Sequence, residues 1–414
     1  MLRLAQAQTY TGIAGYSPPT NVVEHSEIDL DQKDMETALK AKDYTAATSA
    51  YATGGQSVKG SGAKRTIKGM SKDLTGEALF DQMKAYYGDD KYGDIWVSGA
   101  LATTKASFTS GRGDADFAAV SDDATREQAV KKGTVYLNVW PYAVHELEAA
   151  VGKCGTDTTG SLHYLDEAVA FYTGSLVGTD ASGDTKGKLM FGLAESRCTD
   201  FGTCGGADKI TGLAEANKLM FAKFDEYKAA INSMNCAALP AMIKEMTDIG
   251  FTPIIQGLLK YAWAVGVDGA GLKYKAEAAT FAAAVLPRVH SCSAADAQTI
   301  YDNTKIGATS TDFTAVKTAV EGNYACMGVT CAQIGGYQKD GAYKAGFAAG
   351  CTTLKDADPL GWGMGPGPTY GIIVGLVVVL LLGAVLVYAK TKVCDKCKKG
   401  KAGGPAAAGS AATV

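Results

Sequence analysis

Apolar residues recur at helical spacing through most of the chain. Between residues 30 and 350 the sequence is rich in Ala and has few alternating runs of β-branched residues, a pattern typical of amphipathic helices rather than strands. Gly-rich stretches at 178–188 and 266–271 interrupt these segments and predict loops. We therefore expect a mostly α fold, an ectodomain of linked helical bundles.

The two ends of the chain follow other patterns. Residues 1–29 include two prolines and few apolar positions, which predicts an extended leader, and they lack the apolar run of a signal peptide, so we expect the sequence to begin at or after a cleavage point. Residues 351–369 predict a Gly-rich juxtamembrane stalk. Residues 370–389 carry no charge and are long enough to cross a bilayer as one transmembrane helix.

Charge gives this helix a direction. The tail at 390–414 holds six Lys and one Asp, so the positive-inside rule places it in the cytoplasm and the body outside, in a single-pass plasma-membrane protein. Gly371 and Gly375 permit two such helices to approach closely as a weak homodimer. The whole chain has a net charge of −3 and the body is more acidic still, which argues against nucleic acid as a partner.

Cysteine usage agrees with an exterior location. Eight of the ten cysteines precede the predicted stalk's end, an even number that fits four disulfides in an oxidising compartment. Many pairings are compatible with eight cysteines, and the sequence alone favours only Cys198 with Cys204.

Two neighbouring helical segments carry the candidate metal ligands. Residues 140–154 are predicted to begin a helix near Pro141, and residues 162–176 form the next helix, so the pair resembles a helical hairpin. Imidazole, phenol and carboxylate groups gathered in a bundle are what a transition-metal site recruits. The alternative is a buried or capping His with solvated acidic side chains. The candidate ligands are Tyr142, His145 and Glu148 at i, i+3, i+6, with His163, Asp166 and Glu167.

A faint internal repeat links two of the predicted helices. Four residues that lie on one helical face recur 110 positions later. If this repeat reflects a duplication of helical bundles, a site between two similar halves is implied. The matching sets are Tyr164, Glu167, Ala168 and Phe171, then Tyr274, Glu277, Ala278 and Phe281.

Enzyme motifs are missing from the sequence. The His145 segment lacks the second His of a metalloprotease helix, and no G-x-S-x-G elbow occurs, so we expect a binding protein and no enzyme. Arg112-Gly113-Asp114 spells an adhesion tripeptide, which supports the alternative of a non-catalytic surface adhesion or structural protein, although a turn explains the same residues. A metal-dependent hydrolase is a third interpretation that has only the hairpin carboxylates in its favour.

Six blocks of sequence resemble the low-iron-inducible iron-assimilation proteins of green algae and the related phytotransferrins of marine microalgae. The blocks are spread over about 200 residues. Their order along the chain matches the order in that family. The blocks are RTIKGMS (65–71), KAYYGDDKYGDIWV (84–97), AVHELEAAVGKC (143–154), LDEAVAFYTGSL (165–176), GLAESRCTDFGTC (192–204) and PIIQGLLKYAWAV (253–265).

This resemblance implies a cell-surface protein that captures ferric iron (Fe3+) for uptake under iron limitation, with carbonate as a synergistic anion. Arg65 and Arg197 lie in the matching blocks and are the candidate carbonate partners. A ferric reductase or the endocytic machinery would be further partners. Because metal ligands must be deprotonated, we expect iron release as the pH falls in an endosomal vesicle.

Overall fold

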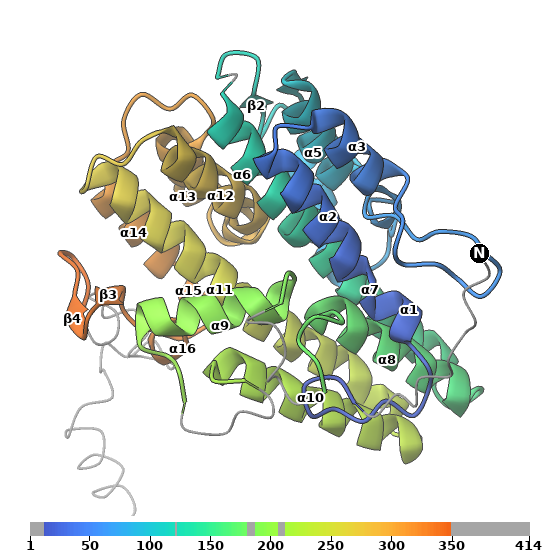
Figure 1. The fold of residues 1–414 in the computed structure, drawn as a ribbon. Coiled ribbons are helices and arrows are strands. Elements are labelled where there is room, and N and C mark those ends of the chain that lie inside the picture. Colours follow the sequence, from blue (N-terminus) through green and yellow to red (C-terminus); the bar gives the residue numbers. More distant parts are fainter. Residues whose placement is uncertain (1–11, 121, 180–186, 206–211, 349–414) are drawn as a thin grey trace, which may run out of the picture. The chain divides into compact units, whose positions relative to one another are not determined.

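The structure, a computed structural model, describes residues 12–120, 122–179, 187–205 and 212–348 (Figure 1). It confirms the predicted mostly α architecture, with only two short two-stranded sheets among the described residues. No helix in these ranges is long and apolar enough to cross a membrane. The stalk, transmembrane helix and tail predicted for 351–414 lie outside the described residues.

Side-chain caps define where many of the helices begin. The side chains of Asp43, Asp122, Asp157, Ser293 and Asp312 each accept a hydrogen bond from the backbone N–H three residues further on, which satisfies an amide with no partner inside the helix. Through α8 the helices are α1 (Val23–Ser26), α2 (Ile28–Lys40), α3 (Tyr44–Ala52), η1 (Lys68–Met70), α4 (Ala78–Tyr87), α5 (Tyr92–Ala102), α6 (Asp123–Gly133), η2 (Thr134–Val139), α7 (Trp140–Lys153) and α8 (Thr158–Thr173).

The second half of the chain is helical in the same way. Its helices are α9 (Met190–Phe201), α10 (Glu215–Asn232), η3 (Cys236–Ala238), α11 (Leu239–Gly266), α12 (Leu272–Cys292), α13 (Ala294–Thr304), α14 (Phe313–Glu321), α15 (Tyr324–Met327) and α16 (Cys331–Ile334). The strands β1 (Lys105–Ala106) and β2 (Ala115–Asp116) pair antiparallel, as do β3 (Gln338–Lys339) and β4 (Ala342–Tyr343).

Two helical hairpins organise the fold. A short loop joins α7 to α8, and another joins α11 to α12, and in each pair the two helices pack along one another. The helix α10 lies against both α8 and α11 (Figure 1). A single hydrophobic core runs through both hairpins, so the predicted bundle is one continuous packed unit over the described residues.

The α7 helix does not begin where the sequence predicts. The helices α6, η2 and α7 follow one another without a break from Asp123 to Lys153, and η2 is a π-helical turn. Pro141 lacks an amide hydrogen and its ring would meet the carbonyl four residues earlier in a regular α-helix. The wider turn directly before Pro141 accommodates this ring, so the chain stays helical through the proline.

The N-terminal segment also differs from the extended leader that was expected. Ile13, Tyr16 and Val22 are almost fully buried, and α1 and the start of α2 lie before the predicted boundary at residue 29. The apolar residues of this segment are few, but most of those described pack into the core. The Tyr16 hydroxyl donates to Asp166 Oδ1 at 2.8 Å, which ties the segment to α8.

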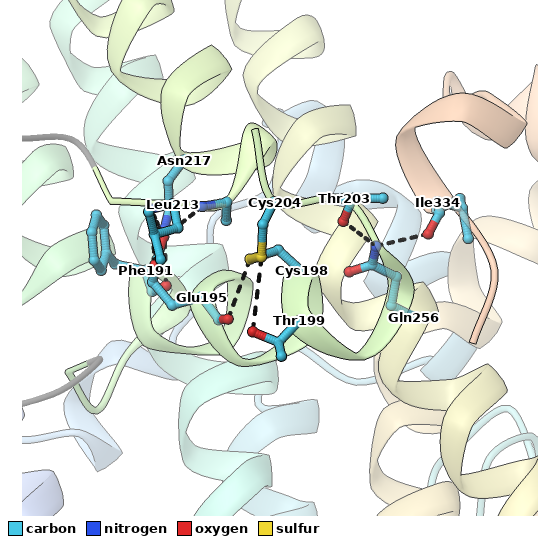
Figure 2. Close-up of a disulfide and its surroundings, with 11 residues drawn as sticks. Phe191, Glu195, Cys198, Thr199, Thr203, Cys204, Leu213, Asn217, Gln256 and Ile334 are labelled. Carbon is cyan, nitrogen blue, oxygen red and sulfur yellow. Dashed lines mark hydrogen bonds between the residues drawn. A yellow bond between two sulfur atoms is a disulfide. The ribbon is translucent and has the colours of Figure 1, made fainter. Parts of the chain in front are cut away.

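Disulfides fix several of the helix ends. The predicted Cys198–Cys204 pair is confirmed and closes the turn at the end of α9, where Glu195 accepts from the backbone N–H of Leu213 (Figure 2). Two further disulfides were not predicted: Cys154–Cys236, which joins the end of α7 to η3, and Cys292–Cys326. Cys331 is disulfide-bonded as well.

Candidate metal centre

Three side chains with closely spaced ligand atoms form the candidate metal centre. His25 of α1 and His163 and Glu167 of α8 place one donor atom each within 4.8 Å of the others. Both His25 Nε2 and His163 Nε2 contact the same carboxylate oxygen, Glu167 Oε1, at 3.1 and 3.0 Å. His163 and Glu167 lie four residues apart and so project from one face of α8, while α1 packs across that face.

The neighbouring helix adds two oxygen donors. Tyr142 and Glu146 of α7 are also four residues apart, and the Tyr142 hydroxyl and the Glu146 carboxyl are hydrogen-bonded. Glu146 is in turn hydrogen-bonded to Glu167 across the hairpin. We call the five residues His25, Tyr142, Glu146, His163 and Glu167 the Glu167 cluster.

The two carboxyl groups of the cluster carry different charges. Burial, reinforced by the adjacent Glu167 carboxylate, raises the pKa of Glu146 to about 8. Burial also acts to raise the pKa of Glu167, but hydrogen bonds from His163 and His25 outweigh it and hold that pKa below its ordinary value. At neutral pH Glu146 is therefore protonated and donates to the charged Glu167. Burial raises the pKa of Tyr142 too, and the phenol stays neutral.

Hydrogen bonds behind the cluster fix the orientation of His163. The Thr20 hydroxyl donates to Asp166 Oδ2 at 2.6 Å, so at 2.8 Å it accepts from His163 Nδ1. The other ring nitrogen, Nε2, consequently faces Glu167. The hydrogen bond to Glu167 raises the pKa of His163, which favours a proton on Nε2. That proton occupies the position where a metal ion would bind the ring.

A basic side chain and a small cavity adjoin the cluster. Arg65 Nη2 contacts His25 Nε2, and the same guanidinium binds Glu24 Oε1 at 3.2 Å. A cavity of about 190 Å³ lies beside Arg65 and Tyr142, and Lys59 and Lys64 also line it. The cavity gives a small polar species a place next to the cluster.

Three predicted ligands lie elsewhere on the hairpin. Asp166 uses both carboxylate oxygens to hold Tyr16 and Thr20, so it anchors the N-terminal segment. His145 Nδ1 binds Glu77 at 2.6 Å. Glu148, whose pKa is raised by burial, lines a separate cavity of about 250 Å³.

Helical geometry explains why Glu146 lies in the Glu167 cluster and Glu148 does not. At 100° per residue, a side chain four positions after Tyr142 is rotated by only about 40°, whereas one six positions after it is rotated by about 120°. The i, i+4 partner of Tyr142 is Glu146, which the prediction passed over. The spacing of i, i+3, i+6 instead leads around the helix to Glu148, away from the cluster.

His25 is the second residue that the sequence analysis missed. It belongs to the segment interpreted as a leader, and 138 positions separate it from His163. The available signal was the scarcity of histidine, since the chain holds only four. The i, i+4 pairs Tyr142–Glu146 and His163–Glu167 were likewise readable in the sequence.

The two candidate carbonate partners and the adhesion tripeptide lie in different parts of the fold. Arg65 adjoins the Glu167 cluster, whereas Arg197 lines a different cavity beside Tyr261. The Arg112 guanidinium donates to the backbone carbonyls of Tyr86 and Ala85, and Asp114 Oδ1 accepts from the backbone of Phe108. Both charged side chains of the adhesion tripeptide are thus bound within the chain, Arg112 at the end of α4 and Asp114 at Phe108.

Comparison with known proteins gives one match. The model of a family described as low iron-inducible periplasmic protein matches residues 1–352. No curated protein and no solved structure matches the chain. The matched range contains every described helix and strand, and with them all five residues of the Glu167 cluster.

Proposed function

Because this chain belongs to the family of low iron-inducible periplasmic proteins, we propose that its Glu167 cluster binds ferric iron for uptake under iron limitation. Membership confirms the resemblance inferred from the six sequence blocks. The observation that carries the proposal is the meeting of two imidazoles and a carboxylate within 4.8 Å, beside a second carboxyl and a phenol.

The donor set suits a hard trivalent cation. Carboxylate and phenolate oxygens are preferred by hard ions, and imidazole nitrogen is a common companion on iron. Glu167 is already charged, and Glu146 and Tyr142 become anionic when they lose their protons. Three anionic donors would then balance the three positive charges of Fe3+, which removes the main cost of burying the ion.

Proton competition supplies a release mechanism for the bound iron. In the empty site Glu146, Tyr142 and the Nε2 atom of His163 all hold protons that the metal must displace. The raised pKa of Glu146 and of His163 means that these protons bind more tightly as the pH falls. Acidification therefore favours protons over iron, and an acidic vesicle after endocytosis would discharge the site.

Arg65 is the candidate for holding a synergistic carbonate. Its guanidinium lies against His25 and borders the cavity that also reaches Tyr142, so an anion there would contact both the arginine and a metal ion in the cluster. A planar guanidinium matches the paired oxygens of carbonate. Arg197 is separated from the cluster and does not fit this role.

The cellular setting stays a proposal. The family description names the periplasm, and three disulfides among the described residues suit an oxidising space. We infer a cell-surface protein held by the segment at 370–389, with a ferric reductase or the endocytic machinery acting on the loaded form. We assign it no catalytic turnover.

Titration of the purified full chain with Fe3+, supplied from a chelator of known affinity, tests the proposal. Wild-type protein should bind one ion and show a phenolate-to-iron absorption band. His163→Gln should weaken binding, and Tyr142→Phe should remove the band. The matched control is His290→Gln, because His290 packs against Tyr86 far along the chain from the cluster. A folded wild-type protein that binds no iron, or a band that survives Tyr142→Phe, would contradict the assignment.

A further inference from the structure

A second polar cavity lies on the other hairpin. It has a volume of about 240 Å³ and is lined by side chains of α2, α6, α9, α11 and α12. We call it the Arg197 cavity. Its charged and phenolic lining residues are Glu36, Lys131, Lys132, Tyr136, Lys188, Arg197 and Tyr261.

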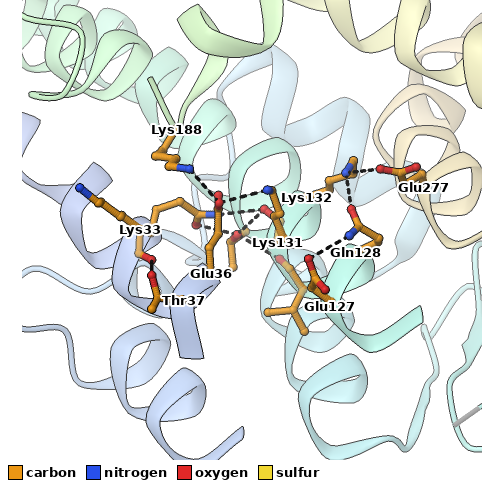
Figure 3. A network of polar contacts seen from close by, with 12 residues as sticks. Lys33, Glu36, Thr37, Glu127, Gln128, Lys131, Lys132, Lys188 and Glu277 are labelled. Carbon is orange, nitrogen blue, oxygen red and sulfur yellow. Dashed lines mark hydrogen bonds and ion pairs between the residues drawn. The ribbon is translucent and has the colours of Figure 1, made fainter. Parts of the chain in front are cut away.

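Cations outnumber carboxylates around this cavity. Lys131 and Lys188 both bind one oxygen, Glu36 Oε2, at 3.0 Å (Figure 3). Lys132 binds Glu277 Oε1 at 2.7 Å, and Glu277 lines the adjoining cavity rather than this one. The four positive groups that line the cavity are bound by three carboxylates, because Asp200 of the adjoining cavity also binds Arg197. The excess is about one positive charge, which favours an anion.

Arg197 has donors to spare. It is 94% buried, and its Nη2 atom reaches Ser196 Oγ at 3.1 Å and Asp200 Oδ2 at 3.2 Å. The guanidinium also lies within reach of the Tyr261 hydroxyl, but its Nε and Nη1 atoms make no hydrogen bond of good geometry among the described residues. A buried N–H without an acceptor is costly, and such groups in native proteins are usually satisfied by a ligand or water.

The side of the cavity that carries Arg197 is rigid. Arg197 precedes Cys198, whose disulfide to Cys204 pins the end of α9 (Figure 2), and the helix packs on α11. At the other side of the cavity, Lys131 and Lys188 keep about a third of their side-chain surface exposed. The cavity thus has a fixed floor and a mouth that a small solute can enter.

We propose that the Arg197 cavity binds a small oxyanion of the phosphate or sulfate class. Arg197 Nε and Nη1 lie on different edges of the guanidinium, so the anion would accept a charged hydrogen bond from one of them. Lys188 and Lys132 supply the additional charge. This site is independent of the iron site proposed above, and it uses none of the residues of the Glu167 cluster.

The electrostatics of Lys132 favour the binding of an anion. Burial, together with the positive charges of Lys131 and Arg197, lowers the pKa of Lys132 to about 8 even though Glu277 is bound to it. An oxyanion in the cavity would favour the charged amine and raise that pKa. Binding should therefore take up protons near pH 8.

Calorimetric titration of the iron-free full chain with inorganic phosphate tests the proposal. Wild-type protein should bind phosphate, Arg197→Gln should weaken binding about 100-fold and Lys188→Gln about tenfold, since each charged hydrogen bond contributes about 1.5–3 kcal/mol. Lys188 binds only Glu36, which keeps Lys131, so the Lys188→Gln variant should fold even if Arg197→Gln does not.

The control variant is Arg65→Gln, which removes the guanidinium beside the Glu167 cluster and should leave phosphate binding unchanged. Absence of phosphate binding to wild-type protein would overturn the proposal, as would equal affinity in the Lys188→Gln variant. Loss of phosphate binding in Arg65→Gln would assign the anion to the iron site and overturn it too. Iron binding by the same samples is measured separately, so the two proposals can fail independently.

Discussion

The helices α8 and α12 carry the same four-residue pattern in opposite electrostatic surroundings. Ala168 and Phe171 on α8 are buried, and so are Ala278 and Phe281 on α12. The glutamate of the pattern differs in its partners: Glu167 meets two histidines, whereas the equivalent Glu277 meets a lysine.

The comparison separates what a helix encodes by itself from what its neighbours add. The repeated apolar positions fix which face of each helix packs into the core. The chemistry of the glutamate depends on side chains from α1 and α7 in one case and from α6 in the other. A shared pattern on two helices therefore predicts similar packing but does not predict a similar ligand.

The largest expected effect comes from exchanging each glutamate for its amide. Glu167→Gln should weaken Fe3+ binding about 1000-fold, or about 4 kcal/mol, because it removes the one carboxylate that both imidazoles contact. Glu277→Gln should change iron affinity by less than about twofold. Competition titrations against a chelator measure both values, and similar losses in the two variants would end the distinction between the helices.

Breaking the ion pair of α12 should mainly affect stability. Lys132→Met leaves Glu277 buried without its cation, and we expect the free energy of unfolding to fall by about 3 kcal/mol. Urea denaturation with the disulfides intact measures this. Lys131→Met, which removes a partly exposed cation, should cost less than about 1 kcal/mol. The double variant Lys132→Met with Glu277→Leu should recover most of the loss, and failure to recover would indicate that Lys132 acts through packing.

The two regions should respond to pH with opposite signs. The pKa of Glu146 is raised to about 8, so below pH 8 its proton must be displaced together with those of Tyr142 and His163, and iron affinity should fall at least tenfold for each unit of acidification. The pKa of Lys132 is lowered to about 8, so acidification charges the amine and should strengthen the binding of sulfate, whose own charge does not change in this range. Affinities measured at pH 8 and pH 6 check both trends, and parallel trends would contradict the assignments.

The smallest expected effect concerns His145. Its Nδ1 atom is engaged with Glu77, so His145→Gln should change iron affinity by less than about twofold, as judged in the same competition titration. A loss comparable to that of His163→Gln would restore His145 to the ligand set that the sequence predicted.

Much of the fold was readable from local pattern. Apolar spacing gave the helices of the α7–α8 hairpin, and the six-residue separation of Cys198 and Cys204 gave one disulfide. Cys154–Cys236 was not predictable, because 82 positions separate the two cysteines and only the packing of α7 against the later helices brings them together. The π-helical turn before Pro141 was also missed, since a proline at that position reads as a helix start.

The site was less predictable than the fold. Sequence spacing predicted a site on α7 and α8, and the structure brings Tyr142, His163 and Glu167 of these helices together. The sequence could not show that α1 packs across these residues, because His25 stands in a segment with little apolar character. Arg65 and Arg197 were equivalent in the sequence, and only their positions in the fold distinguish the cluster from the second cavity.

One continuous helix carries residues of both regions. Lys132 precedes the π-helical turn at Thr134–Val139, and Glu146 follows it on the same unbroken helix. Such a turn holds one residue more than regular winding, so if the same residues wound as a regular α-helix, everything downstream would be rotated by about 100°. Lys132 would keep its place while Glu146 rotated away from Glu167. That extra residue sets the angle around the helix axis between Lys132 in the second cavity and Glu146 in the Glu167 cluster.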